Sequence, residues 1–181
     1  MSEANEVLAR LQSEMDQRYE ELLATRRRKV TPSDPWPLEV VVCDELAHYL
    51  TSGDRKTRLE FAERMRDLVA RGRAAGVIVL AATQKPSHDI IPTSLRDLFG
   101  FRWALRCSTP QASDTVLGQG WASQGFSAAT IDSAARGVGF LLHEGGLPIR
   151  LRSFHLSDSD LEDLAVRAEK LRSQAALGET G

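Results

Sequence analysis

Two adjacent carboxylates, Asp44 and Glu45, follow an apolar run in the stretch EVVVCDELA. A second apolar run ends in Thr83 and Gln84. Ligands of parallel α/β sheets bind at the carboxyl ends of the strands, so we expect these four polar residues at one edge. An acid pair beside a hydroxyl and an amide suits hydrolysis of a phosphoanhydride, with one acid for magnesium or its water and one for the attacking water. The alternative interpretation is that an acid caps the next helix.

Long helices and apolar strands alternate along the chain, which predicts βαβ units and a parallel sheet. The strand before Asp44 has no polar alternation apart from Glu39, as expected for a sheet that is covered on both faces. The predicted helices span residues 3–29, 57–75 and 157–175, the predicted strands 38–43, 77–82 and 101–107, and a predicted hairpin 137–143 and 148–154.

Composition narrows the class of protein. A chain of 181 residues with 42% hydrophobic residues predicts one domain with a real core. Its net charge of −2 argues against a globally basic nucleic-acid binder and leaves room for a local basic lining. Cys43 and Cys107 lie in apolar runs and are predicted to be reduced core residues. With no apolar run as long as a membrane span and no signal-peptide pattern, we expect a cytoplasmic chain.

Several consecutive motifs resemble one family. The stretch VVVCDELAHYL, then a helix ending in RGRAAGVIVLAATQKPSHDII, is similar to the FtsK/SpoIIIE family of DNA-pumping ATPases. The resemblance continues through SLRDLFGFRWALRCSTPQASDTVLG to GVGFLLHEGGLPIRLRSFHLSDSDLEDL and covers about residues 5–165. It implies an α/β fold, a RecA-like P-loop NTPase core with a mostly parallel sheet flanked by helices and a C-terminal β-hairpin. It divides the chain into an N-terminal helix of the motor domain (1–30), the core from Walker B onward (31–156), and a C-terminal helix with a frayed tail (157–181).

The resemblance also assigns roles at the strand ends. Asp44 matches the Walker B aspartate, which binds Mg²⁺ through water, and Glu45 matches its catalytic neighbour. Gln84, after Thr83, matches the sensor at the end of the next strand. These residues would belong to an ATP site.

Two arginines match positions of the family. Arg73, in RAAG, matches the arginine that reaches into the neighbouring subunit's nucleotide site, where it would neutralise charge on the transferred phosphoryl group. Arg102 is the second candidate for that role. The alternatives are a plain helix-end cation for Arg73 and a structural ion pair for Arg102.

DNA contact in such motors is made by pore loops that track phosphates. The matching positions are Lys85 and Arg96, and the turn after the acids adds Arg55 and Lys56 as weaker candidates. A basic run at 26–29 ends the first predicted helix, where a solvated helix end is favoured over a nucleic-acid contact.

The chain departs from the family in two places. It contains no G-x-x-x-x-G-K-[ST] phosphate loop, so it resembles the C-terminal half of a motor domain, and no ATP hydrolysis is expected from it alone. The family has cations after the strand at 101–107, where this chain has Pro110 and Asp114, which weakens the case for a standard subunit interface.

The resemblance therefore implies part of a ring-forming, hexameric, ATP-driven translocase of double-stranded DNA. No winged-helix pattern follows Leu156, which favours plasmid or conjugative-element transfer over chromosome segregation. Two alternatives stay open: a protein-export ATPase of the type VII secretion kind, and a truncated, non-catalytic module that docks into complete rings. A membrane-anchored segment would lie outside these residues.

Overall fold

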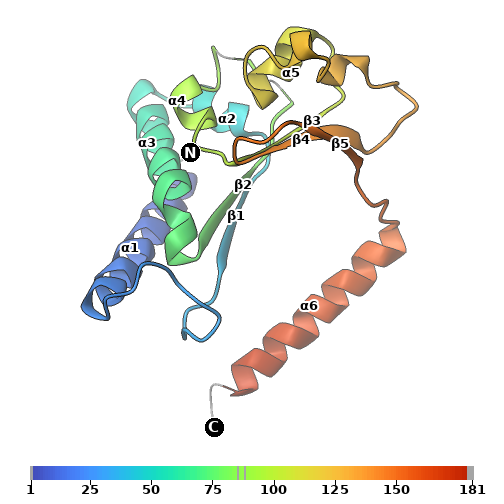
Figure 1. The fold of residues 1–181 in the computed structure, drawn as a ribbon. Helices are drawn as coiled ribbons and strands as arrows, with labels where there is room; N and C mark the ends of the chain where they lie inside the picture. The colour runs from blue at the N-terminus through green and yellow to red at the C-terminus, as the bar shows by residue number, and fades with distance from the viewer. Residues whose placement is uncertain (1, 85, 88, 179–181) are drawn as a thin grey trace.

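The chain folds around two small sheets, and one long helix stands apart from both (Figure 1). The computed structural model describes residues 2–84, 86–87 and 89–178. Its helices are α1 (Ser2–Ala24), α2 (Leu46–Thr51), α3 (Arg55–Arg71), α4 (Thr93–Arg96), α5 (Pro110–Leu117) and α6 (Asp158–Gly178). Its strands are β1 (Glu39–Cys43), β2 (Val77–Ala81), β3 (Phe101–Leu105), β4 (Val138–His143) and β5 (Ile149–Arg152).

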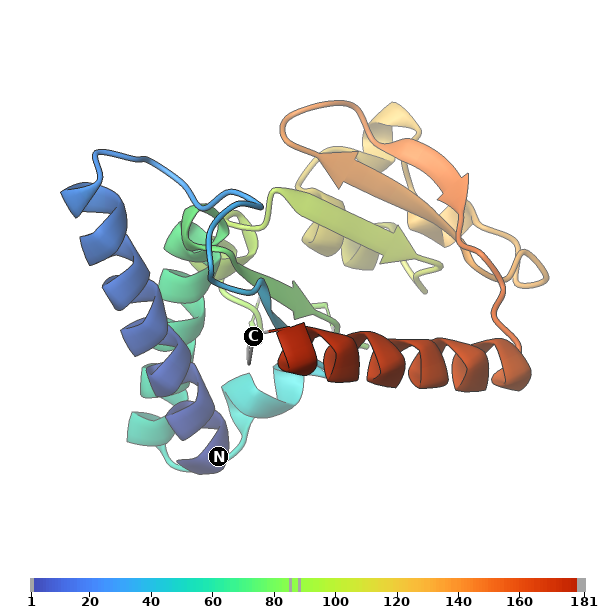
Figure 2. The same cartoon turned by 90° about the horizontal axis from the view of Figure 1, so that it is seen from below.

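β1 and β2 form a two-stranded parallel sheet, paired from Glu39 opposite Val77 to Cys43 opposite Ala81. The long helices α1 and α3 pack together on one face of this sheet (Figure 2). The apolar spacing along both helices supplies the larger core, which holds Leu8, Leu11, Met15, Phe61, Met65, Leu68 and Val77. Burial of these side chains holds the parallel pair in place, because two strands alone are not stable in water.

The other face of this sheet is open, so the prediction of a sheet covered on both faces is wrong for the described residues. The exposed fractions are 58% for Val40, 67% for Val42, 44% for Ile78 and 60% for Leu80. Both covering helices pack on the opposite face, which leaves none for this one among the residues that the structure describes. The apolar sequences of β1 and β2 suit a sheet that is buried on both faces, but only the face that packs on α1 and α3 is buried.

β3, β4 and β5 form a separate antiparallel sheet in the order β3-β4-β5. The predicted C-terminal hairpin is confirmed, whereas β3 pairs with this hairpin and does not extend the parallel pair. Burial alternates along β3, as is typical of antiparallel sheets with one packed face: Ala104 is buried and Arg102 half-buried on one face, whereas Phe101, Trp103 and Leu105 are exposed on the other. A second core lies on the side of α5 and contains Ala104, Leu117, Ala128, Val138, Phe140 and Leu142.

The ends of the helices differ from the predicted ones. α1 ends at Ala24, and Arg26 has a left-handed φ of 56°, so the basic run at 26–29 lies beyond the helix. α3 begins two residues before its predicted start, because Asp54 caps it by accepting a hydrogen bond from the Thr57 N–H. Within the described part of the chain, no helix has the length and apolar character needed to cross a bilayer.

Candidate functional site

Asp44 and Glu45 form the turn between the end of β1 and the start of α2. Glu45 has a left-handed backbone, with φ 57° and ψ 65°, which is uncommon for a residue other than glycine. Two backbone hydrogen bonds tie this turn to the end of β2: Leu46 N–H donates to the Ala82 carbonyl at 2.7 Å, and Ala82 N–H donates to the Cys43 carbonyl at 2.9 Å. The acids are therefore held on the continuation of both strands.

The Glu45 carboxylate points at the end of β2. Its Oε1 accepts a hydrogen bond from Thr83 Oγ1 at 2.6 Å, and its Oε2 accepts one from the Gln84 N–H at 3.1 Å. Glu45 occupies the position before α2 without making a side-chain capping bond, so the helix-cap alternative does not describe its carboxylate. The structure thus brings Glu45, Thr83 and Gln84 together, with Asp44 exposed beside them.

This arrangement suits water activation next to a bound phosphate. A carboxylate held by a hydroxyl and an amide N–H is fixed in orientation, which suits a group that orients a water molecule. Among the described residues, no group of three or more His, Cys, Asp or Glu side chains could hold a metal ion by itself. Mg²⁺ bound to nucleotides uses one or two carboxylates, several waters and the phosphates, and the exposed carboxylate of Asp44 fits that mode.

Arg73 lies at the other end of β2. It belongs to a short 3₁₀ helix, Gly72–Ala75, directly before this strand. A five-residue strand rises about 16 Å, so Arg73 lies roughly that far from the Thr83 end of the sheet. Its exposed guanidinium forms an ion pair with Glu144, in the turn between β4 and β5. Sequence reasoning missed Glu144, for which an acid in the Glu-Gly-Gly turn is the only local signal.

Arg102 is in a more buried setting. Its Nη1 lies 3.4 Å from Oδ1 of Asp97, and its buried Nε has no hydrogen-bond partner in the described part of the chain. Burial lowers the pKa of Arg102, while Asp97 acts in the opposite direction. These contacts agree with the structural alternative for this arginine.

The candidate DNA contacts differ in exposure. Lys56 is 87% exposed, with Glu60 at 3.8 Å, and Arg55 is exposed in the first turn of α3. Arg96 is only 12% exposed, because it pairs with Asp97 and donates to the Thr115 carbonyl. Lys85 lies outside the described residues. Arg55 and Lys56, the weaker candidates from sequence, are thus more accessible than Arg96.

The two departures after β3 have local structural roles. Pro110 is the first residue of α5, where its missing N–H costs nothing, and Thr109 caps this helix. The Asp114 carboxylate accepts hydrogen bonds from the Gly120 N–H at 3.0 Å and the Ala122 N–H at 2.7 Å. An acid at this position therefore orders the glycine-rich segment that follows α5.

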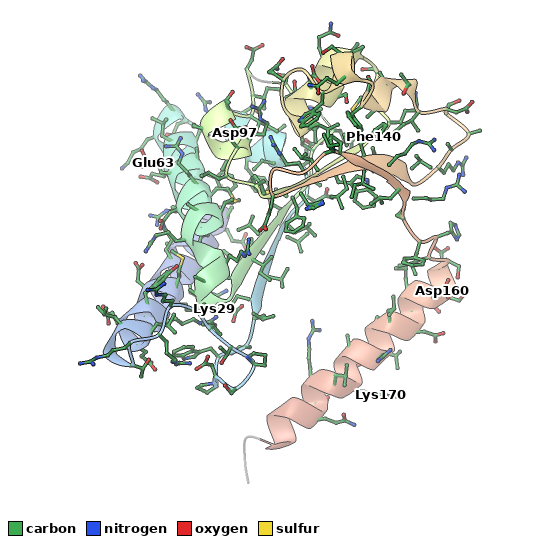
Figure 3. All side chains as sticks on the ribbon, viewed as in Figure 1. Lys29, Glu63, Asp97, Phe140, Asp160 and Lys170 are labelled. Carbon is green, nitrogen blue, oxygen red and sulfur yellow. The ribbon has the colours of Figure 1, made fainter. Side chains whose placement is uncertain are left out.

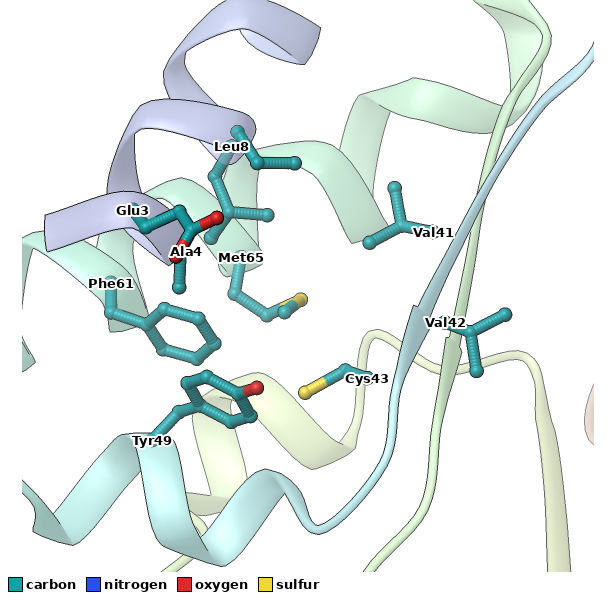
Figure 4. Close-up of a pocket in the computed structure, with 10 residues that line it drawn as sticks. Glu3, Ala4, Leu8, Val41, Val42, Cys43, Tyr49, Phe61 and Met65 are labelled. Carbon is teal, nitrogen blue, oxygen red and sulfur yellow. The ribbon is translucent and has the colours of Figure 1, made fainter. Parts of the chain in front are cut away.

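An open pocket of about 330 Å³ lies on the helix-covered side of β1 (Figure 4). Side chains of α1, α3 and β1 line it, together with Tyr49 of α2 and Glu3 at the start of α1. Asp44 and Glu45 are not among its lining residues, so this pocket is separate from the acid site.

Solved structures show which fold the chain has. The conjugation coupling protein TcpA of pCW3, determined with ATPγS, matches 92% of this chain and 49% of its own with a TM-score of 0.74 and 19% identity. The cytoplasmic domain of the type VII secretion ATPase EccC of Thermomonospora curvata matches 84% of this chain and 18% of its own, with a TM-score of 0.61 and 22% identity. The fold is therefore that of RecA-like P-loop ATPase motor domains.

Sequence relatives give the family within that class. No family model matches the chain. DNA translocase FtsK 2 of Ralstonia nicotianae is 30% identical over 146 residues, which are 79% of this chain and 16% of the relative. FtsK of Pseudomonas aeruginosa is 33% identical over 137 residues, 75% of this chain and 15% of the relative. The chain is thus a relative of the FtsK/SpoIIIE translocases and spans less than a fifth of the length of these two.

Proposed function

We propose that this chain supplies the Walker B side of an ATP-driven motor that translocates double-stranded DNA. The observation that carries the proposal is the Glu45 carboxylate, held by Thr83 and the Gln84 N–H at the carboxyl edge of a parallel sheet. Both sequence relatives described above are DNA translocases. The fold of this chain matches both a conjugation coupling protein and a secretion ATPase, so the fold does not distinguish DNA from protein as the cargo. The choice of DNA is based on the sequence relatives.

ATP hydrolysis at this edge needs one group for water and one for the metal. Glu45 would polarise the water that attacks the γ-phosphorus, and Gln84 would sense the γ-phosphate. Asp44 would hold Mg²⁺ through water, and Mg²⁺ would supply charge neutralisation at the β- and γ-phosphate oxygens. The 181 residues contain no G-x-x-x-x-G-K-[ST] loop, so the phosphate cradle is assigned to another segment of the complete motor.

The place of Arg73 supports assembly of several copies. It lies at the amino end of β2, while Glu45 lies at the carboxyl end of the sheet, so one copy cannot bring both to the same phosphate. Arg73 would therefore complete the site of a neighbouring copy, with Glu144 as its partner in the free chain. A hexameric ring in the cytoplasm, with any membrane anchor outside these residues, is the assembly that we propose.

DNA contact would be electrostatic and independent of sequence. Arg55 and Lys56 are exposed in the first turn of α3, and a few cations per copy add up around a ring. Lys85 and the small exposed part of Arg96 are further candidates. This explains how a chain with a net charge of −2 could serve a DNA motor.

A triplex-displacement assay on the complete motor tests the function. We expect ATP-dependent displacement that Asp44→Asn abolishes and that Arg55→Gln with Lys56→Gln weakens most at low salt, with a smaller difference as salt rises. Lys29→Gln, which removes an exposed cation away from α3, serves as the matched control. ATP turnover that is indifferent to DNA, with no displacement, would overturn the DNA proposal.

A further inference from the structure

Four apolar side chains form a continuous open surface on the parallel sheet. Val40 pairs with Ile78 and Val42 with Leu80, and all four side chains are exposed on the face opposite α1 and α3. We call this surface the open sheet face. Parallel sheets normally carry helices on both faces, and an exposed apolar patch of this kind marks an interaction surface.

α6 stands apart from the two sheets (Figures 1 and 3) and carries a second unpartnered apolar surface. From Asp158 to Gln174 every residue is exposed except Ala168, which is half-buried. Leu161, Leu164, Ala168 and Leu171 follow one another at spacings of three and four, so they lie along one side of the helix, which we call the α6 stripe. A helix without tertiary contacts is marginal in water, so α6 needs a surface to pack on.

We propose that the α6 stripe of one copy docks on the open sheet face of a second copy, and that the second copy reciprocates. The two surfaces match in size. Leu171 lies ten positions after Leu161, which is about 15 Å along a helix. A five-residue strand is about 16 Å long, and two strands spaced about 4.8 Å apart fit beneath one helix.

Charge fixes the direction of the docked helix. The first turns of α6 are acidic, and its later turns carry Arg167, Lys170 and Arg172. At the amino end of the sheet lie the exposed Arg28 and Lys29, beside the bond from the Val30 N–H to the Ala74 carbonyl. At the carboxyl end lies the exposed Asp44. Opposite charges meet at both ends when α6 runs parallel to β1.

We assign the α6 that docks on the open sheet face to a second copy, because α6 projects from its own chain on a short linker. Five residues separate it from the end of β5, and it stands away from the sheets of its own chain. Ser157 and Asp160 cap its first turn reciprocally: the Ser157 N–H donates to the Asp160 carboxylate, and the Asp160 N–H donates to Ser157 Oγ. A preformed helical arm on a short linker is the kind of element that identical chains exchange.

Sedimentation analysis of the chain and of three variants tests the proposal. We expect a concentration-dependent dimer whose Kd rises at least about tenfold, or about 1.4 kcal/mol, on Leu164→Glu in the stripe and on Val42→Glu in the open sheet face. Val166→Glu is the matched control, because Val166 is as exposed as Leu164 on the same helix but lies off the stripe. Trp fluorescence confirms that each variant is folded, and Leu80→Glu replaces Val42→Glu if the latter unfolds.

A mixing experiment distinguishes the pairing of surfaces. Leu164→Glu keeps an intact sheet face and Val42→Glu keeps an intact stripe, so an equimolar mixture regains one of two junctions and should dimerise more tightly than either variant alone. No gain on mixing would indicate helix-to-helix contact and overturn the proposal. So would a chain that stays monomeric at millimolar concentration, which would place α6 on its own sheet, or an equal effect of Val166→Glu.

Discussion

Thr83→Val tests whether the contact between Glu45 and the end of β2 is a real constraint on the candidate site. The substitution keeps the β-branched shape of Thr83 and removes the hydroxyl that donates to Glu45 Oε1 at 2.6 Å. The Gln84 N–H remains as a donor to the carboxylate, so Glu45 is not left without a partner. The change therefore measures one charge-assisted hydrogen bond.

The magnitude follows from the chemistry and the exposure of the pair. Hydrogen bonds to charged groups contribute about 1.5–3 kcal/mol when shielded from water. Thr83 and Glu45 are half-buried, so we expect a loss of about 1–2 kcal/mol in the free energy of unfolding. For a chain of this length, that loss corresponds to a decrease in Tm of about 3–6 °C. Thr83→Ser, which retains the hydroxyl, should lose less than half as much.

A double-mutant cycle in urea provides the assay. Thr83→Val, Glu45→Ala and the double variant are unfolded under the same conditions, and the coupling energy is the part of the double loss that the single losses do not explain. We expect a coupling of about 1 kcal/mol. A coupling below about 0.3 kcal/mol, the scatter of independent sites, would refute the claim that Thr83 positions Glu45.

Three further predictions concern nucleotide chemistry and pH. The chain alone should show no ATP turnover, because it contains no phosphate loop; clear turnover that Asp44→Ala abolishes would contradict this. In the complete motor, Arg73→Ala should stop turnover and leave nucleotide binding intact, as fluorescent-nucleotide titration would show, whereas lost binding would indicate a structural role. Burial raises the pKa of Cys43 from 9.0 to about 11, so the folded state favours the neutral thiol. The contribution of this thiol to the free energy of unfolding is fully present below pH 9 and is lost as the pH rises towards 11. Cys43→Ala should therefore remove this part of the pH dependence of Tm.

Much of the acid site is predictable because its residues follow two recognisable strands. The apolar runs before Asp44 and Thr83 imply a parallel pair, and parallel strands bring their carboxyl ends together. The contact that forms differs in one detail. Sequence reasoning gives Gln84 a role through its side-chain amide, whereas the observed donor to Glu45 is its backbone N–H. Spacing predicts which residues meet and leaves open which atoms do so.

Long-range pairing was less predictable. Glu144 meets Arg73 across 71 positions, and nothing in either segment selects the other beyond opposite charge. β3 looked like another strand of the parallel sheet and instead pairs with β4, because strand partners depend on the packing of whole elements. The open face of β1 and β2 is a second example. The apolar sequence of a strand indicates that its faces favour burial, but it does not identify the element that packs on each face.

The positions of Glu45 and Arg73 connect the two proposals. They lie at opposite ends of one short parallel sheet, so a site that uses both requires two copies in a fixed relation. The open sheet face lies between these ends, and the proposed α6 contact would occupy it. A helix there, running parallel to β1, would bring its cationic turns towards Asp44 and its acidic turns towards Lys29. The cationic turns of a docked α6 would then lie beside the Asp44 carboxylate that Mg²⁺ would need, so nucleotide binding by the complete motor should lower the fraction of chains with docked α6.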